Sequence, residues 1–221
     1  PPIFKLTGHH LDQHSFPPRR SSDLIVDTVS SMSALRIPVT ELGIDCCIFG
    51  VQKALALPPG LAVFTASEKA IKRAETVEHR GYYFDFLEFV ANDDKDNTPS
   101  TPCISLIYGL DCQLQRIFSE GVEARWARHL AMAEQTRNWA LERGFELFAP
   151  EGARSVTLTC VANSRGADLA GVKKRLDERG FAFDDGYGKI KGQTFRVAHM
   201  GDLQLAELEE FLALLDEELA R

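Results

Sequence analysis

One lysine of this 221-residue chain has the surroundings expected of a covalent catalyst. Lys53 follows an apolar run at 44–49 and lies between apolar residues and a Pro-Pro-Gly turn at 58–60. Burial disfavours a charged ammonium and favours the neutral amine that attacks carbonyl carbons. The position therefore indicates a Schiff-base lysine, although a surface lysine whose stem lies along apolar neighbours would give the same pattern.

A carboxylate occupies a similar position after another apolar run. Asp27 follows Leu24-Ile25-Val26, and in open α/β sheets ligand sites gather at the carboxyl ends of strands. Such an acid could equally be the N-cap of a following helix. Together, however, Lys53 and Asp27 are the two groups that a pyridoxal phosphate site requires. The amine binds the aldehyde, and the acid binds the pyridinium nitrogen.

The elements that position these residues can be predicted from hydrophobic patterning. Short apolar runs closed by Gly, Pro or Asp indicate buried strands of an α/β sheet, and a three-to-four spacing of apolar residues indicates helices. The polar stretch Ala91–Pro102 indicates a loop. After Gly144, alternating strands and helices predict a small separate domain. The predicted strands are 24–27, 44–49, 61–65, 156–161 and 194–198, and the predicted helices are 67–77, 104–119, 122–143, 167–179 and a last helix capped by Asp202.

Composition and charge exclude several classes of protein. With 44% hydrophobic and 26% charged residues, the chain is typical of globular domains, and a net charge of -7 argues against coating of nucleic acid. No apolar run approaches the roughly 20 residues that cross a bilayer, and no secretion signal is recognisable. Five cysteines without a C-x-x-C motif indicate reduced thiols in a cytoplasmic protein. The acids of the last helix are expected to form a solvated face: Glu207, Glu209, Glu210, Glu217 and Glu218.

Residues 1–24 differ from the rest of the chain. They mix Pro, His, Arg and Ser without a helical or strand period, and His14–Leu24 resembles a translated sequencing adapter. We therefore expect this leader to be foreign sequence that does not pack with the fold, with a disordered natural leader as the alternative. His9, His10 and His14 have no further ligands nearby, so no metal site is expected.

Four segments, in this order, resemble class V aminotransferases of the alanine/serine–glyoxylate (serine–pyruvate) type. They are DTVSS at 27–31, GIDCCIFGVQKALALPPGLA at 43–62, TPSTPCISLIYGL at 98–110 and GYGKIKGQTFRVAHMGD at 186–202. The resemblance covers the chain from Ile25 onward. It implies the fold type I pyridoxal phosphate fold, with residues 25–121 in a large α/β domain and 122–221 in a small C-terminal α+β domain. It also implies a homodimer with shared active sites.

The resemblance assigns roles to the residues around the lysine. Lys53 matches the family's Schiff-base lysine, and Asp27 matches the partner of the pyridine nitrogen. Val29 matches the residue that packs under the cofactor ring, and Gln52 matches a phosphate ligand. Val51 stands where the family commonly has Ser, which puts one minor polar contact in doubt.

Two further segments complete the implied site. The loop 97–102 matches the segment that reaches the cofactor phosphate of the partner subunit. Arg196 matches the arginine that holds the substrate carboxylate through two parallel hydrogen bonds. A salt bridge between Arg196 and an ordinary surface acid is the alternative, and His199 is expected to be structural. The candidates for the phosphate contact are Asn97, Thr98, Ser100 and Thr101.

The implied reaction is ping-pong transamination of alanine or serine, with glyoxylate or pyruvate as acceptor and pyridoxal 5'-phosphate as cofactor. The expected partners are these small molecules and a second subunit, with no nucleic acid and no membrane. The family's upstream cofactor-binding residues cannot be assigned within residues 1–24, so the chain alone is expected to be inactive. A cysteine desulfurase, which characteristically has His where Gln52 stands, is one alternative. A truncated, non-catalytic remnant of the fold is another.

Overall fold

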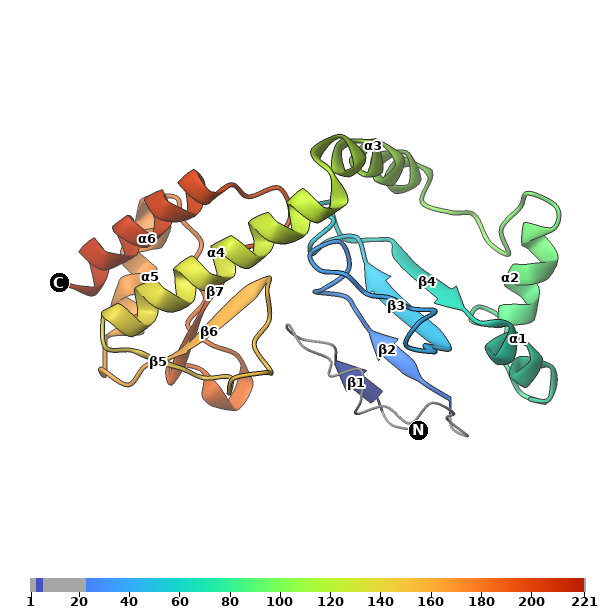
Figure 1. Ribbon diagram of the computed structural model, residues 1–221, viewed down its shortest axis with the longest axis horizontal. Helices are drawn as coiled ribbons and strands as arrows, with labels where there is room; N and C mark the ends of the chain where they lie inside the picture. The colour runs from blue at the N-terminus through green and yellow to red at the C-terminus, as the bar shows by residue number, and fades with distance from the viewer. Residues whose placement is uncertain (1–2, 6–22, 221) are drawn as a thin grey trace. The chain divides into compact units, whose positions relative to one another are not determined.

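The computed structural model consists of two compact units (Figure 1). It describes residues 3–5 and 23–220, with side chains from residue 23 onward. The N-terminal unit contains residues 3–5, 23–32 and 37–116, and the C-terminal unit contains residues 33–36 and 117–220. The domain boundary that we expect between residues 121 and 122 of the complete protein remains a prediction.

A four-stranded sheet organises the N-terminal unit. Its strand order is β1-β2-β3-β4, in which the first three strands are parallel and β4 is antiparallel to β3 (Figure 1). The predicted helix start at Ser67 is confirmed, because the Ser67 side chain accepts a hydrogen bond from the Ala70 N–H at 3.1 Å. The elements are β1 Ile3–Lys5, β2 Ile25–Asp27, β3 Cys46–Gly50, β4 Ala62–Ala66, α1 Glu68–Glu75, α2 Phe86–Asp93 and α3 Ile104–Glu120.

A buried carboxylate connects the starts of β2, β3 and α1. Asp45 is 7% exposed and accepts hydrogen bonds from the Leu24 N–H at 3.0 Å, the Ser67 hydroxyl at 2.9 Å and the Lys69 ammonium at 2.9 Å. Burial by itself would raise the pKa of Asp45, but the bond to Lys69 and the two other hydrogen bonds lower it below the usual value. Asp45 therefore remains a carboxylate and fixes how β2 and β3 begin.

Two expectations about irregular segments are wrong. Within residues 1–24 we expected no packed element, but Ile3–Lys5 forms β1, and Leu24 is 4% exposed within a small apolar cluster. The free edge of β2 accounts for β1, because unpaired backbone groups on a sheet edge accept another short strand. The expected loop Ala91–Pro102 begins later, since α2 continues to Asp93. Residues 6–22, with the three leader histidines, lie outside the described residues.

The C-terminal unit is a three-stranded antiparallel sheet, in the order β5-β6-β7, packed with helices (Figure 1). Its apolar core joins residues of α4, α5 and α6 to Val161 of β6 and Phe195 of β7. No helix in the described part of the chain is both long and apolar enough to cross a membrane. The elements are α4 Val122–Glu142, β5 Glu146–Leu147, β6 Leu158–Ala162, α5 Leu169–Glu178, the short 3-10 helix Gly188–Ile190, β7 Thr194–Ala198 and α6 Leu205–Leu219.

The last helix differs from its prediction in its cap. The N-cap of α6 is Gln204, which forms a capping box with Glu207, and not Asp202. Asp202 instead accepts a hydrogen bond at 3.2 Å from the guanidinium of Arg125, whose side chain is 1% exposed. An acid two residues before the cap could not be distinguished from the cap itself by residue type, because both are frequent at helix starts.

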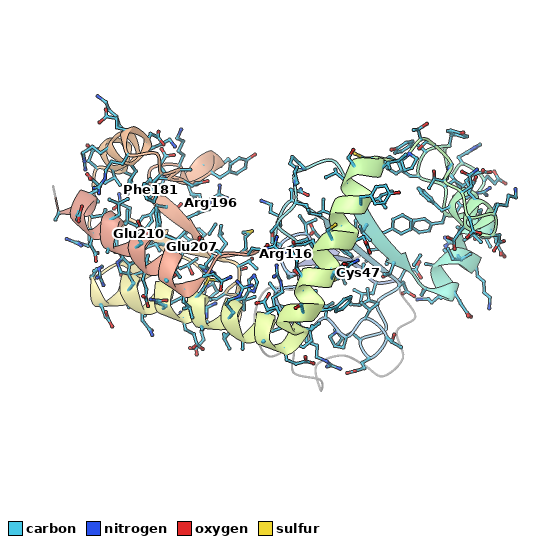
Figure 2. All side chains as sticks on the ribbon, turned by 90° about the horizontal axis from the view of Figure 1, so that it is seen from above. Cys47, Arg116, Phe181, Arg196, Glu207 and Glu210 are labelled. Carbon is cyan, nitrogen blue, oxygen red and sulfur yellow. The ribbon has the colours of Figure 1, made fainter. Side chains whose placement is uncertain are left out.

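The acidic face of α6 is only partly solvated. Glu207 and Glu210, labelled in Figure 2, are exposed as expected, but Glu218 is 0% exposed. Its carboxylate accepts hydrogen bonds from Arg175 at 2.7 Å and from Arg179 at 2.9 Å. Arg175 lies in α5, and Arg179 is the C-cap of that helix. Glu218 thus lies on the packed side of the helix, where two cations balance its charge.

Two histidines are buried in the C-terminal unit. The Nδ1 atom of His199 donates to the Val156 carbonyl at 3.1 Å, and its Nε2 atom accepts from the Thr159 hydroxyl at 2.8 Å. His129 similarly donates from Nδ1 to the carbonyl four residues earlier and accepts the Gly201 N–H at Nε2, 3.2 Å away. Burial lowers the pKa of each to about 4. The expectation that His199 is structural is confirmed.

Candidate active site

The parallel pairing of β2 and β3 brings two of the expected site residues to one edge of the sheet. Asp27 ends β2 opposite Ile48, and β3 continues for two more residues to Gly50. Lys53 follows three residues later, in the turn that leaves β3. Asp27 therefore ends β2 and Lys53 follows the neighbouring strand β3, as predicted, whereas a pocket shared by the two side chains stays a prediction.

A buried hydroxyl fixes the relative position of these strand ends. Thr28 is 0% exposed, and both its N–H and its hydroxyl donate to the Ile48 carbonyl, at 2.8 and 3.0 Å. Its Oγ1 atom also lies 3.2 Å from the Sγ atom of Cys47, labelled in Figure 2. Because the Thr28 hydroxyl donates to Ile48, the Cys47 thiol, whose pKa is raised by burial, is the donor in this contact. The residue after Asp27 is thus fixed to β3.

The carboxylate of Asp27 is oriented by a local turn. Its Oδ1 atom accepts a hydrogen bond from the Val29 N–H at 2.9 Å. The alternative of a helix cap does not apply, because residues 29–34 form turns and no helix begins there. Within the described residues the Asp27 carboxylate accepts no other hydrogen bond, so its second oxygen can bind a ligand. Val29 is half-buried beside it.

The turn after β3 exposes the lysine and buries its neighbours. The Leu57 N–H donates to the Val51 carbonyl at 3.0 Å and closes the turn. Val51, Ala54 and Leu55 are at most 3% exposed, whereas the side chain of Lys53 is exposed. Our expectation that apolar side chains surround Lys53 is wrong for this structure, because the turn directs the apolar positions inward and Lys53 outward. The Lys53 ammonium has no ion-pair partner among the described residues.

Gln52 lies beside the lysine at the same strand end. Its side chain is exposed and folds over the backbone of Gly50, where an added Cβ atom would overlap the side-chain amide. Gly50 is buried, and it lets the amide approach the end of β3 closely. The amide can therefore donate a hydrogen bond to a ligand at this edge of the sheet.

The loop expected to reach a phosphate is exposed throughout the candidate positions. The Thr98 hydroxyl donates to the Ser100 carbonyl at 2.7 Å, and the Asn97 N–H donates to the Asn92 carbonyl at 3.0 Å. Because the Thr98 proton is used within the loop, the remaining side-chain donors are those of Asn97, Ser100 and Thr101.

Arg196 lies in the C-terminal unit, on β7 opposite Cys160 of β6 (Figure 2). Its Nη2 atom forms an ion pair with Asp184, a partly exposed acid. A salt bridge with a surface acid was the alternative to substrate binding for Arg196. The ion pair agrees with that alternative, but it does not assign Arg196 a role. The Tyr187 ring lies 5.8 Å from the guanidinium carbon. Patterning could not identify Asp184 and Tyr187, because a loop closure brings them to Arg196.

No group of three or more His, Cys, Asp or Glu side chains in residues 3–5 and 23–220 could hold a metal ion. All five cysteines are free thiols in this structure. The chemistry-bearing groups of the N-terminal unit are therefore an amine, a carboxylate, an amide and hydroxyls. These groups suit an organic cofactor that carries an aldehyde, a ring nitrogen and a phosphate.

Solved structures define the class of fold. The chain superimposes on alanine–glyoxylate aminotransferase from Nostoc sp. with a TM-score of 0.81 and 27% identity, over 90% of this chain and 54% of the other. The fold is therefore that of fold type I pyridoxal-phosphate-dependent transferases. Residues 19–194 match the family described as Aminotransferase class-V, and the chain belongs to that family. The match begins within the leader 1–24, which further limits the expectation that all of the leader is foreign.

Two curated relatives share less than half of their length with this chain. A serine–glyoxylate aminotransferase of Methylorubrum extorquens is 36% identical over 188 residues, which are 81% of this chain and 46% of the relative. An L-aspartate–glyoxylate aminotransferase of Paracoccus denitrificans is 35% identical over 183 residues, 81% of this chain and 46% of the relative. The chain thus spans about half the length of these relatives.

Proposed function

We propose that the complete protein is a pyridoxal-phosphate-dependent aminotransferase that converts a small amino acid, serine or alanine, with glyoxylate or pyruvate as acceptor. The observation that carries this proposal is the placement of Asp27 and Lys53 after adjacent parallel strands. Family membership supports this class of reaction. The names of two similar proteins, a serine–glyoxylate and an alanine–glyoxylate aminotransferase, support it as well.

Lys53 is suited to hold the cofactor and to move a proton. Its side chain is exposed and unpaired among the described residues, so its amine can reach a carbonyl carbon. Bound pyridoxal phosphate supplies an electron sink that stabilises the negative charge left at the substrate Cα atom when its proton is removed. With its amine free, Lys53 would be placed to take the Cα proton of the substrate as general base and to deliver a proton to the acceptor carbon as general acid.

Asp27 and its neighbours are suited to orient the ring. The free oxygen of the Asp27 carboxylate would accept a hydrogen bond from a protonated ring nitrogen and would favour that charged form. The bond from the Val29 N–H holds the carboxylate at the strand end, and half-buried Val29 offers an apolar contact for the ring. Gln52 contributes an amide donor for the phosphate. These groups fit the cofactor by type and by position in the N-terminal sheet.

A second subunit is part of the proposal. The side chains of Asn97, Ser100 and Thr101 are exposed donors that can bind a phosphate held by the other subunit of a homodimer. Several large apolar side chains of the N-terminal unit are also exposed, which supports an interface with another chain. They include Tyr82, Tyr83, Phe84, Ile104 and Tyr108, with exposed fractions of 57% or more.

Arg196 is proposed to bind the α-carboxylate of the substrate. The test compares the complete protein with its Arg196→Ala variant in turnover of serine or alanine with glyoxylate. Loss of a charge-assisted pair should lower kcat/KM by about 30- to 1,000-fold, or roughly 2–4 kcal/mol, while the cofactor absorbance persists. Arg165→Ala is a matched control, because Arg165 stacks on Phe145 in the same unit. Unchanged kcat/KM in Arg196→Ala, or no turnover by the unaltered protein, contradicts the proposal.

A further inference from the structure

Arg196 is already held by a carboxylate of its own chain. In addition to the ion pair, its backbone N–H donates to the Asp184 carbonyl at 3.0 Å, and the two residues form an isolated antiparallel bridge. The hydrogen bond from Arg196 lowers the pKa of Asp184 below its usual value, so Asp184 is a carboxylate at neutral pH. Backbone and side chain therefore both keep Asp184 next to the guanidinium.

The loop around Asp184 prevents this carboxylate from moving away easily. Its Oδ1 atom accepts a hydrogen bond from the Gly186 N–H at 2.9 Å. Gly186 has φ +97°, and a Cβ atom there would lie 2.7 Å from the Ile190 carbonyl oxygen and 2.8 Å from the Thr194 carbonyl oxygen. Only glycine fits this close approach. Asp184 is thus fixed at both of its oxygens.

The pair changes the charge that a ligand meets at Arg196. The Arg196 side chain is 32% exposed, so part of the guanidinium can reach a ligand. Its Nε atom is buried and has no hydrogen-bond partner among the described residues. One carboxylate already balances the positive charge at Nη2. An incoming carboxylate therefore meets a nearly neutral pair instead of an isolated cation.

We propose that Asp184 is a specificity-determining residue, which orients Arg196 for a single carboxylate and disfavours amino acids that carry a second one. This inference rests on the proposed role of Arg196 in substrate binding. Serine or alanine brings one carboxylate to the pair, whereas aspartate or glutamate brings two, and the fixed Asp184 carboxylate repels the second. Asp184 thereby selects monocarboxylic amino donors by charge.

The test measures kcat/KM for serine and for aspartate, with glyoxylate as acceptor, in the complete protein. Asp184→Asn keeps an acceptor for the Gly186 N–H but removes the charge. We expect this variant to raise the aspartate-to-serine ratio of kcat/KM by about tenfold or more, which corresponds to about 1.4 kcal/mol. Asp185→Asn is the matched control, because the neighbouring Asp185 carboxylate pairs with Lys191, at 3.8 Å from its Nζ atom. In this variant the aspartate-to-serine ratio of kcat/KM should change less than about twofold.

A binding measurement separates this inference from the proposed function. Calorimetric titration of the unaltered protein with propionate and with succinate requires neither turnover nor a stable variant. Tighter binding of propionate supports the inference. Binding of neither ligand, or equal or tighter binding of succinate, overturns it. An unchanged aspartate-to-serine ratio in an active Asp184→Asn variant also overturns it and leaves the aminotransferase proposal intact, whereas absence of turnover in the unaltered protein counts against that proposal alone.

Discussion

The two units use polar side chains in different ways. In the C-terminal unit His129, His199 and Glu218 are fully buried within or beside a large apolar core, and each has hydrogen-bond partners. In the N-terminal unit the apolar cluster around Cys47 is small, and Lys53 is exposed. In the C-terminal unit, buried polar groups stabilise the core. The N-terminal unit also fixes its strands with buried Asp45 and Thr28, but it presents Lys53 at a surface that can meet a cofactor or another chain.

Acid should lower the stability of the C-terminal unit more than that of the N-terminal unit, and this is the largest effect that we expect. The folded pKa of His129 and of His199 is about 4, below the unfolded value of about 6.5, so the unfolded state binds protons first. Their contribution to stability is complete above about pH 6.5 and is lost as the pH falls toward 4, by about 3 kcal/mol for each histidine. The pKa of Asp45 is lowered, so the N-terminal ion pair with Lys69 persists in this range.

Urea unfolding at several pH values measures this difference. Both tryptophans, Trp126 and Trp139, belong to the C-terminal unit, so their fluorescence reports on that unit alone. The urea concentration at the midpoint of unfolding should decrease as the pH is lowered from 7 to 4.5. His199→Asn should make this midpoint depend less on pH. A midpoint that stays constant over this range would contradict the assignment of two neutral buried histidines.

Removal of the buried charge in the C-terminal unit should have the next largest effect. Glu218→Gln weakens two charge-assisted hydrogen bonds at a fully buried position, and we expect a loss of about 2–3 kcal/mol of unfolding free energy. Glu217→Gln is the control on the same helix, because Glu217 is 61% exposed and should cost less than about 1 kcal/mol. Equal losses in the two variants would show that burial of Glu218 does not matter for stability.

The corresponding change in the N-terminal unit should be smaller. Asp45→Asn keeps one acceptor but places an amide donor against groups that themselves donate, so we expect a loss of about 1–2 kcal/mol. Amide hydrogen exchange of β2 and β3 measures it locally. Asp23→Asn is the control, since Asp23 is 46% exposed and contacts the same Lys69 at 3.1 Å. Protection that is unchanged in Asp45→Asn would contradict the anchoring role of this residue.

Sequence patterning predicted the elements well where local signals were strong. The helices α3 and α4 and the strand β7 were predicted nearly to the residue, because apolar periodicity and flanking glycines define them. The positions of Asp27 and Lys53 at strand ends followed from the apolar run that precedes each residue. Periodicity could not predict that the turn after β3 exposes Lys53, because the direction of a side chain in a turn depends on backbone hydrogen bonds.

Long-range partners were the other gap in prediction. Glu218 looked like a solvated acid because its two arginines lie on another helix, about 40 residues earlier in the chain. Asp184 carried no local signal, since only the closure of the loop before β7 brings it to Arg196. Such pairs depend on tertiary packing, and a single sequence does not encode them in its spacing.

We expect Lys53, which follows β3 of the N-terminal sheet, to be the residue that binds the cofactor. The direct measurement treats the complete protein with pyridoxal phosphate, reduces it with borohydride and maps the modified peptide by mass spectrometry. Lys72→Ala, which removes an exposed lysine of α1, is the control and should leave the modification in place. We expect one modified lysine, Lys53, and loss of the modification in Lys53→Ala. Modification of another lysine in its place would contradict it.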